Sequence, residues 1–166
     1  MPDGFAEFVA THSRSLLRTG WLLSGNETTA QDLVQTALMK SWPRWDRVEA
    51  AGAEAYVRRV MVSTFLTWRR RRWHGEVPTE VLPDLAGDRD VFGDNDMRGV
   101  VMQALGTLAS RQRAVVVLRY FNDLTEAETA KALGCSVGTV KSQTAKAFAH
   151  LRVSELADLL TEESAP

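Results

Sequence analysis

The middle of the chain most constrains the fold, because it breaks every regular hydrophobic pattern. Residues 75–95 contain Pro78, Pro83 and three glycines, and their apolar residues follow neither a helical nor an alternating period. Proline and glycine interrupt helices and strands, so this stretch predicts a linker. All five tryptophans of the chain precede residue 76. We therefore expect two small domains, each with its own core, on either side of a linker.

The net charge of -1 conceals blocks of opposite sign. Residues 1–75 hold 11 Lys and Arg against 7 Asp and Glu, residues 76–99 hold 2 against 7, residues 100–153 hold 7 against 3, and the tail 154–166 holds none against 4. Two basic segments around an acidic one indicate a polyanion that is contacted at two places. We expect a first domain at 1–75, an acidic flexible linker at 76–99 and a second domain at 100–160.

Apolar residues recur at helical spacing in both domains, and no alternating run is sustained, so the predicted fold class is all-α. In the first domain Asp3 is the expected N-cap of the first helix, Pro43 ends the second, and residues 45–52 form a loop. In the second domain the run VVVL favours a strand, but it is short and has no partner. The second and third helices should bury Ala30, Leu33, Val34, Ala37, Leu38 and Ser41, and Tyr56, Val57, Val60, Met61, Thr64 and Trp68, respectively.

The segment from Thr125 to Leu151 carries the most specific local pattern. Thr125 and Glu128 form a capping box, which marks the start of a short helix. Gly134 suits the positive φ of a helix C-terminus, and Ser136 can cap a second helix. A short helix, a glycine turn and a second helix make a helix-turn-helix, whose second helix enters the major groove of DNA.

The two faces of that second helix differ in character. Its inward positions are expected to be Val137, Val140, Thr144, Ala147 and Leu151, which are small or largely apolar. Its outward positions are hydrogen-bonding or basic, which suits phosphates and base edges, and a glutamine there can pair with adenine through two bonds. An ordinary pair of helices with a solvated face is the alternative. The outward residues are Thr139, Lys141, Ser142, Gln143 and Lys146.

Residues 68–73, WRRRRW, lie at the end of the third predicted helix. Consecutive helical residues point about 100° apart, so the arginines form no flat stripe. The pattern fits either a solvated helix end, where the dipole favours cations, or a clamp on a phosphate backbone. In the clamp, Trp45 or Trp73 could stack on exposed bases. A DNA-reading module downstream favours the clamp, whose expected residues are Arg58, Arg59, Arg69, Arg70, Arg71 and Arg72.

Three segments together resemble the extracytoplasmic-function (group IV) sigma factors of the sigma-70 family. LTEAETAKALGCSVGTVKSQTAKAFAHLR resembles region 4, TAQDLVQTALMKSW resembles region 2.2, and AYVRRVMVSTFLTWRRRR resembles regions 2.3–2.4. The resemblance implies a transcription initiation factor that binds core RNA polymerase. Region 2 would open promoter DNA at the -10 element, with a pocket for a flipped base at the loop 45–52. Region 4 would read the -35 element.

The resemblance also implies partners and site residues. Asp32 and Gln35 would dock on the β′ coiled coil of the polymerase, region 4 would contact the β flap, and an anti-sigma protein is a further partner that the family allows. Ser63 stands where many members have an asparagine that contacts a flipped -10 base. Gln143 and Phe148 stand where many have basic residues. The promoter sequence therefore cannot be transferred from other members.

Other classes of function find little support in the sequence. Cys135 and the three histidines show no ligand spacing, so we expect no metal and no cofactor. No nucleophile–base pair or glycine-rich phosphate loop indicates an enzyme. The absence of a signal peptide and of an apolar run of ~18 residues predicts a cytoplasmic protein without membrane insertion. The alternative is a conventional helix-turn-helix regulator that does not replace the sigma subunit.

Overall fold

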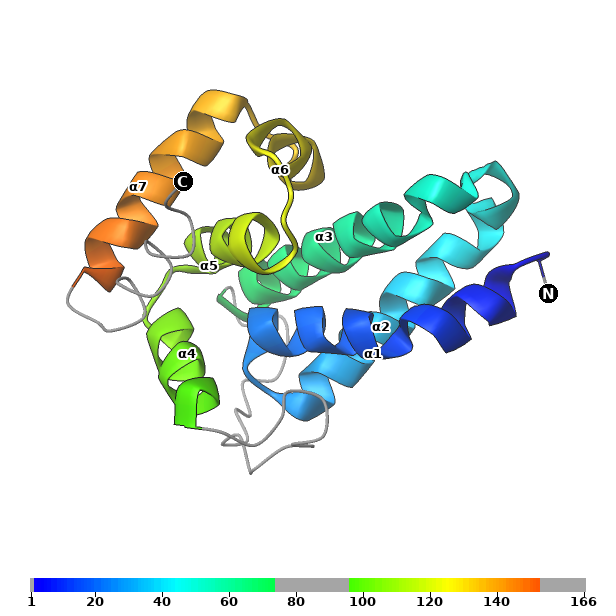
Figure 1. The fold of residues 1–166 in the computed structure, drawn as a ribbon, viewed down its shortest axis with the longest axis horizontal. Helices are drawn as coiled ribbons and strands as arrows, with labels where there is room; N and C mark the ends of the chain where they lie inside the picture. The colour runs from blue at the N-terminus through cyan, green and yellow to red at the C-terminus, as the bar shows by residue number, and fades with distance from the viewer. Residues whose placement is uncertain (1, 74–95, 153–166) are drawn as a thin grey trace. The chain divides into compact units, whose positions relative to one another are not determined.

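The computed structural model describes residues 2–73 and 96–152 (Figure 1). Every regular element in these two ranges is helical, which confirms the predicted all-α fold class. The chain divides into two compact units, Met1–Val91 and Phe92–Pro166, and each is described by itself. Most of the predicted linker lies outside the described residues. Its last four positions, 96–99, belong instead to the first turn of a helix.

In its described part, residues 2–73, the first unit has three α-helices, and each of them contacts the other two (Figure 1). They are α1 (Phe5–Ser24), α2 (Glu27–Ser41) and α3 (Ala53–Trp73). Aromatic and aliphatic side chains from all three helices, and from the segment between α2 and α3, form one core. Its buried members are Phe5, Phe8, Leu16, Val34, Ala37, Trp45, Ala53, Val57 and Met61.

The predicted buried face of α2 is confirmed, except that Leu38 is half-buried. On α3 the prediction is confirmed for Val57, Met61 and Thr64, whereas Tyr56, Val60 and Trp68 are only half-buried. Two further residues of α3, Val62 and Phe65, are also buried, although the expected stripe did not include them. The reason is that α3 packs against both α1 and α2, so it buries a wider face than a helix with one neighbour.

The first helix begins differently from the prediction. Gly4, with a φ of 80°, occupies the N-cap position and no side chain caps the helix, so the assignment of Asp3 is wrong. In contrast, α2 begins at a side-chain cap, where the amide of Thr29 donates to Asn26 Oδ1 at 2.9 Å. A glycine at positive φ starts α1 through its backbone freedom, without a capping side chain.

The connection between α2 and α3 is more ordered than the predicted loop. The α-helix ends before Pro43, as expected. Two 3-10 turns follow, η1 (Trp42–Arg47) and η2 (Ala50–Gly52). Because the buried Trp45 belongs to η1, this connection is part of the core.

Helices α1 and α2 approach closely at Gly20. A Cβ atom at this position would lie 3.1 Å from the carbonyl oxygen of Ala30 and 3.2 Å from its Cα. Both are backbone atoms, which cannot rotate away as a long side chain can. The contact therefore depends on the absence of a side chain at Gly20.

Over residues 96–152, the second unit has four α-helices and one π-helical turn. The β-prone run VVVL is helical, and Val115, Val116, Val117 and Leu118 are all fully buried at its centre. Burial therefore outweighs strand propensity at this position. The elements are α4 (Asp96–Gly106), α5 (Ser110–Val116), the π turn η4 (Val117–Phe121), α6 (Glu126–Leu133) and α7 (Val137–Leu151).

Candidate nucleic-acid interface

A reciprocal pair of hydrogen bonds starts α6. The amide of Thr125 donates to Glu128 Oε1 at 2.8 Å, and the amide of Glu128 donates to Thr125 Oγ1 at 3.1 Å. The backbone bond from Thr125, followed by the bond with its side chain, holds the pKa of Glu128 below its ordinary value, because both favour the carboxylate. The predicted capping box is confirmed.

The turn between α6 and α7 also has the predicted construction. Gly134 ends α6 with a φ of 68°, and the amide of Cys135 donates back to the carbonyl of Ala130 at 3.0 Å. Ser136 Oγ then accepts from the amide of Thr139 at 3.1 Å and starts α7. Two capped helix ends joined by a left-handed glycine fix the angle between the helices of a helix-turn-helix.

The exposure of α7 follows most of the predicted pattern. Val140, Ala147 and Leu151 are buried, and Thr144, also predicted to face inward, is half-buried. Val137, however, is 38% exposed, so its place on the inner face is a correction. It is the first residue of the helix. Of the outward residues, Lys141, Ser142 and Lys146 are exposed, and Thr139 and Gln143 are half-buried.

Phe148 has a structural role in this unit. Its ring lies edge-on to Tyr120, with 5.3 Å between centroids. Tyr120 in turn lies under the guanidinium of Arg119, which donates to the carbonyl of Leu124 at 2.8 Å. At the position where the sequence resemblance implies a basic residue, this chain has an aromatic contact between α7 and the π turn.

The basic end of α3 is accessible over most of its described length. Arg69, Arg70 and Arg71 are exposed, and the side chain of Arg72 lies outside the described residues. Arg59 is half-buried, with its guanidinium 5.9 Å from the centre of the Tyr56 ring. The exposed arginines at 69, 70 and 71 are therefore well placed for a phosphate backbone.

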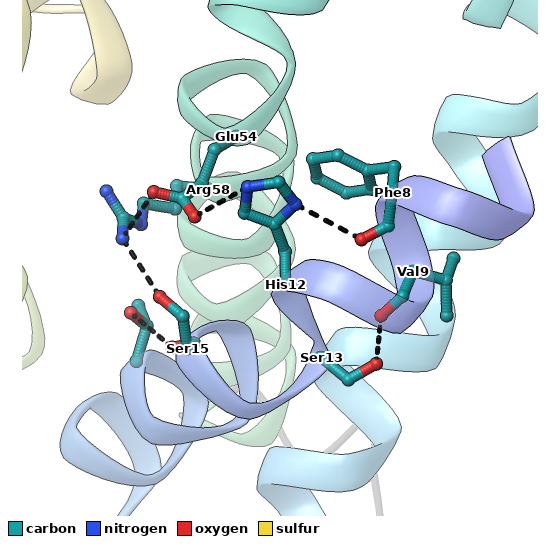
Figure 2. Close-up of polar contacts among 8 residues, drawn as sticks. Phe8, Val9, His12, Ser13, Ser15, Glu54 and Arg58 are labelled. Atoms are coloured by element: carbon teal, nitrogen blue, oxygen red, sulfur yellow. Dashed lines mark hydrogen bonds and ion pairs between the residues drawn. The ribbon is translucent and has the colours of Figure 1, made fainter. Parts of the chain in front are cut away.

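Arg58, in contrast, binds other side chains of the first unit (Figure 2). Its guanidinium pairs with Glu54 at 2.9 Å and donates to Ser15 Oγ at 3.2 Å, so that it joins α3 to α1. Figure 2 shows the ring of His12 on the other side of Glu54, where Nε2 lies 3.4 Å from the carboxylate and Nδ1 lies 3.1 Å from the carbonyl of Phe8. With a side chain only 15% exposed, Arg58 does not match the predicted DNA clamp.

Trp45 also departs from its predicted role. It is 7% exposed, and its ring packs against Phe5 and Phe8 with centroid distances of 5.0 and 4.9 Å. At this low exposure Trp45 is a core residue in this structure and not an exposed platform for a base. Ser63, the other residue expected near a flipped base, is exposed on α3.

An exposed face of α2 combines polar and apolar residues. Asp32 and Gln35 are both exposed, and one helical turn further lies Met39, which is 71% exposed. Trp42, 43% exposed, continues the same side of the helix. Met39 and Trp42 are not among the surface residues predicted from the sequence. The hydrophobic pattern nevertheless indicates their exposure, because neither position falls on the predicted buried face of α2.

A groove of about 880 Å³ lies beside the predicted pocket loop. It runs between the beginning of α1 and the connection from α2 to α3, and it includes Phe8, Trp45 and Val48. Its ionisable side chains are mainly acidic, which makes it unsuitable for a phosphate. These are Asp3, Glu7, His12 and Asp46.

Within the described residues, no three His, Cys, Asp or Glu side chains lie together in a way that could hold a metal ion. No described helix is sufficiently long and apolar to cross a membrane.

Comparison with known families and proteins accounts for both units. A family model described as Sigma-70 region 2 matches residues 8–75, and one described as Sigma-70, region 4 matches residues 98–151. The RNA polymerase sigma-E factor of Streptomyces avermitilis is 46% identical over 149 residues, which cover 89% of this chain and 83% of that protein. The ECF RNA polymerase sigma factor SigM of Mycobacterium tuberculosis is 31% identical, over 89% of this chain and 74% of that protein.

A solved structure agrees at the level of the fold. The sigma factor RpoE of Bartonella quintana, in complex with the anti-sigma factor NepR, aligns over 99% of this chain and 100% of that chain. The TM-score is 0.71 and the sequence identity is 22%. With both sigma regions matched and close relatives aligned along most of their length, the chain belongs to the sigma-70 family, as an extracytoplasmic-function sigma factor, a class of DNA-binding protein that directs RNA polymerase at the start of transcription.

Proposed function

We propose that the chain binds core RNA polymerase and brings it to promoters that its two units read separately. The observation that carries this proposal is the occurrence, in one chain, of sigma region 2 and sigma region 4. A conventional helix-turn-helix regulator needs only a DNA-reading unit like the second. In our assignment residues 1–75 act at the -10 element and residues 100–160 at the -35 element.

At the -35 element, α7 lies in the major groove, with its N-terminal part toward the bases. Lys141 and Lys146 contact phosphates, because both are exposed cations on the outward side. Ser142 and Gln143 provide hydrogen-bonding groups for base edges. Thr139 lies close to the capping hydroxyl of Ser136, with 3.0 Å between the two oxygens, and so supports the start of the helix.

At the -10 element, Arg69, Arg70 and Arg71 hold the backbone while a base leaves the stack. Unstacking costs a few kcal/mol, which contacts made only by the flipped base must offset. The groove beside η1 can supply such contacts, because its carboxylates accept hydrogen bonds from the amino group of a base and repel phosphates. The exposed hydroxyl of Ser63 is a second candidate contact.

The exposed face of α2 is the proposed polymerase contact. Asp32 and Gln35 supply polar groups, and Met39 and Trp42 supply apolar area on the same side. Aromatic residues and methionine are enriched at protein interfaces, where they provide much of the binding energy. We assign this face to the β′ coiled coil and the second unit to the β flap.

Three further parts of the proposal follow from the same assignment. The chain has no catalytic step of its own, since promoter opening requires binding contacts alone. It acts in the cytoplasm, where the polymerase is. An anti-sigma protein is a candidate regulator, because the sigma factor RpoE is found in a complex of this kind.

The test is transcription with purified core polymerase on genomic fragments, with start sites mapped. We expect start sites that appear only when the chain is added. The double variant Asp32→Ala/Gln35→Ala should bind core polymerase more weakly while keeping its helical circular dichroism. Glu27→Ala, in the first turn of α2, serves as the control. A chain that binds DNA alone but neither binds core polymerase nor starts transcripts with it would be a conventional regulator instead.

A further inference from the structure

The outward face of α7 is not centred on the glutamine. Val140, Ala147 and Leu151 are buried and define the direction toward the interior of the unit. At ~100° per residue, Gln143 points only about 60° from the direction of Val140. Its half-buried state agrees with this position. Gln143 therefore lies at the flank of the DNA-facing surface.

The centre of that surface is formed by a hydroxyl and a methyl group. By the same rotation, Ser142 and Ala145 point about 160° and 140° away from Val140, and both are exposed. Lys141 and Lys146 point about 100° and 120° away on opposite sides, and they are exposed too. The cations thus lie at the two edges, where phosphates run, and the two small side chains lie between them.

We propose that the methyl group of Ala145 reads a thymine in the -35 element through the C5-methyl of that base. The inference rests on the proposed function of the second unit. An alanine has no hydrogen-bonding side chain, and in the major groove the thymine methyl is the base-edge group suited to apolar contact. Its small size also lets the helix approach the base edges closely, because the lysines leave the centre of the face free.

The expected effect is modest and measurable. Removing one methyl-sized group from a dry contact weakens binding by about fourfold, from the free energy of burying one such group. Deoxyuridine differs from thymidine only by that methyl. A thymine-to-uracil exchange in the DNA therefore tests the contact without changing the protein.

The experiment uses the complex of the full chain with core polymerase and a -35 sequence obtained by binding selection. Each thymine is replaced singly by uracil, and the dissociation constants are compared. We expect about a fourfold loss at one thymine for the unchanged chain. Ala145→Gly should bind the thymine duplex about fourfold more weakly and no longer distinguish thymine from uracil at that position.

Ala149→Gly is the matched control. It makes the same change at an exposed position of the same helix, with the same loss of helix propensity. Ala149 lies one turn further toward the C-terminal end of α7 than Ala145, away from the part of a recognition helix that contacts bases, so this variant should keep the uracil effect. The inference is overturned if uracil has no effect at any -35 thymine, if the selected element has no A·T pair, or if Ala145→Gly still distinguishes the two bases. If the complex selects no -35 element at all, the proposed function fails as well.

Discussion

Individual arginines of the first unit have different roles, although they are close in sequence. Arg58 joins α1 to α3 through Glu54 and Ser15, whereas Arg70 is exposed at the end of α3. An arginine with two protein partners contributes to the stability of the unit. An exposed arginine at a helix end is available to an external anion.

This difference gives the first prediction. Arg70→Ala should lower the salt dependence of promoter binding by roughly 0.7–0.9 in the slope of log K against log salt, because one phosphate contact is lost. Arg58→Ala should instead lower the free energy of unfolding by about 1 kcal/mol, through loss of its charged hydrogen bonds. The measurements are DNA binding at several salt concentrations and urea unfolding of both variants. Equal effects of the two variants on the salt slope would contradict the assignment.

Arg58 and Trp45 differ from their predicted roles because residues distant in the sequence determine their environment. The bond between Arg58 and Ser15 spans 43 positions, and Trp45 is buried by Phe5 and Phe8 of another helix. Neither contact leaves a local pattern. The basic character of residues 69–71 was predictable, because an exposed helix end needs no tertiary partner.

The starts of the helices differ in how well the sequence predicts them. The capping box of α6 was predictable, since its two partners are three residues apart and both bonds are local. The start of α1 was not, because Asp3 has a capping side chain but the backbone turns one residue later, at Gly4. Sequence therefore indicates helix starts well where side chains make the cap, and less well where backbone freedom does.

The capping box predicts a dependence on pH. The pKa of Glu128 is lowered in the folded chain, so its carboxylate stabilises the fold above the ordinary pKa. This contribution is lost as the pH falls through the lowered pKa of the folded state. Unfolding of the second unit, followed from neutral pH to below the ordinary pKa of 4.5, should therefore show acid destabilisation.

Glu128→Gln is the control for this prediction. Glutamine can form the same capping box but does not titrate. The difference in unfolding free energy between the unchanged chain and the Glu128→Gln variant should become smaller as the pH falls. A constant difference across the pH range would show that the ionised form of Glu128 has no part in stabilising α6.

The contact between α1 and α2 gives a third prediction, from one substitution at two glycines. Gly20→Ala should destabilise the chain by about 1–3 kcal/mol, because the new Cβ meets the backbone of Ala30. Gly99→Ala, in the exposed part of α4, should stabilise it by about 0.5–1 kcal/mol, since nothing lies within 4 Å of the new Cβ and alanine favours the helix. Thermal unfolding measures both. Opposite signs are expected, and stabilisation by Gly20→Ala would contradict the close packing.

At the scale of the whole molecule, the chain consists of two helical units with separate cores. Composition located this division because proline, glycine and acidic residues gather between them. The linker predicted from composition extends to residue 99, whereas α4 already begins at Asp96. Acidic residues are common both in linkers and in the first turn of a helix, where they interact favourably with the dipole, so charge alone does not separate the two.

Because the two units have separate cores, their contributions to promoter affinity should be independent. Lys146→Ala and Arg70→Ala should each lower the salt slope by roughly 0.7–0.9, and the double variant by the sum. Binding of the polymerase complex to one promoter at several salt concentrations measures all three. If the salt slope of the double variant is no lower than that of either single variant, the two units do not bind the same DNA together.

The uneven distribution of aromatic residues also makes the chain its own optical probe. All five tryptophans precede residue 76, so intrinsic tryptophan fluorescence arises from the first unit alone. The buried Trp45 and the exposed Trp42 should emit at different wavelengths, the first sensitive to unfolding and the second to a protein that covers α2. Melting of the first unit and docking on polymerase can therefore be followed in the intact, unlabelled chain. The second unit has no tryptophan and contributes nothing to the tryptophan emission.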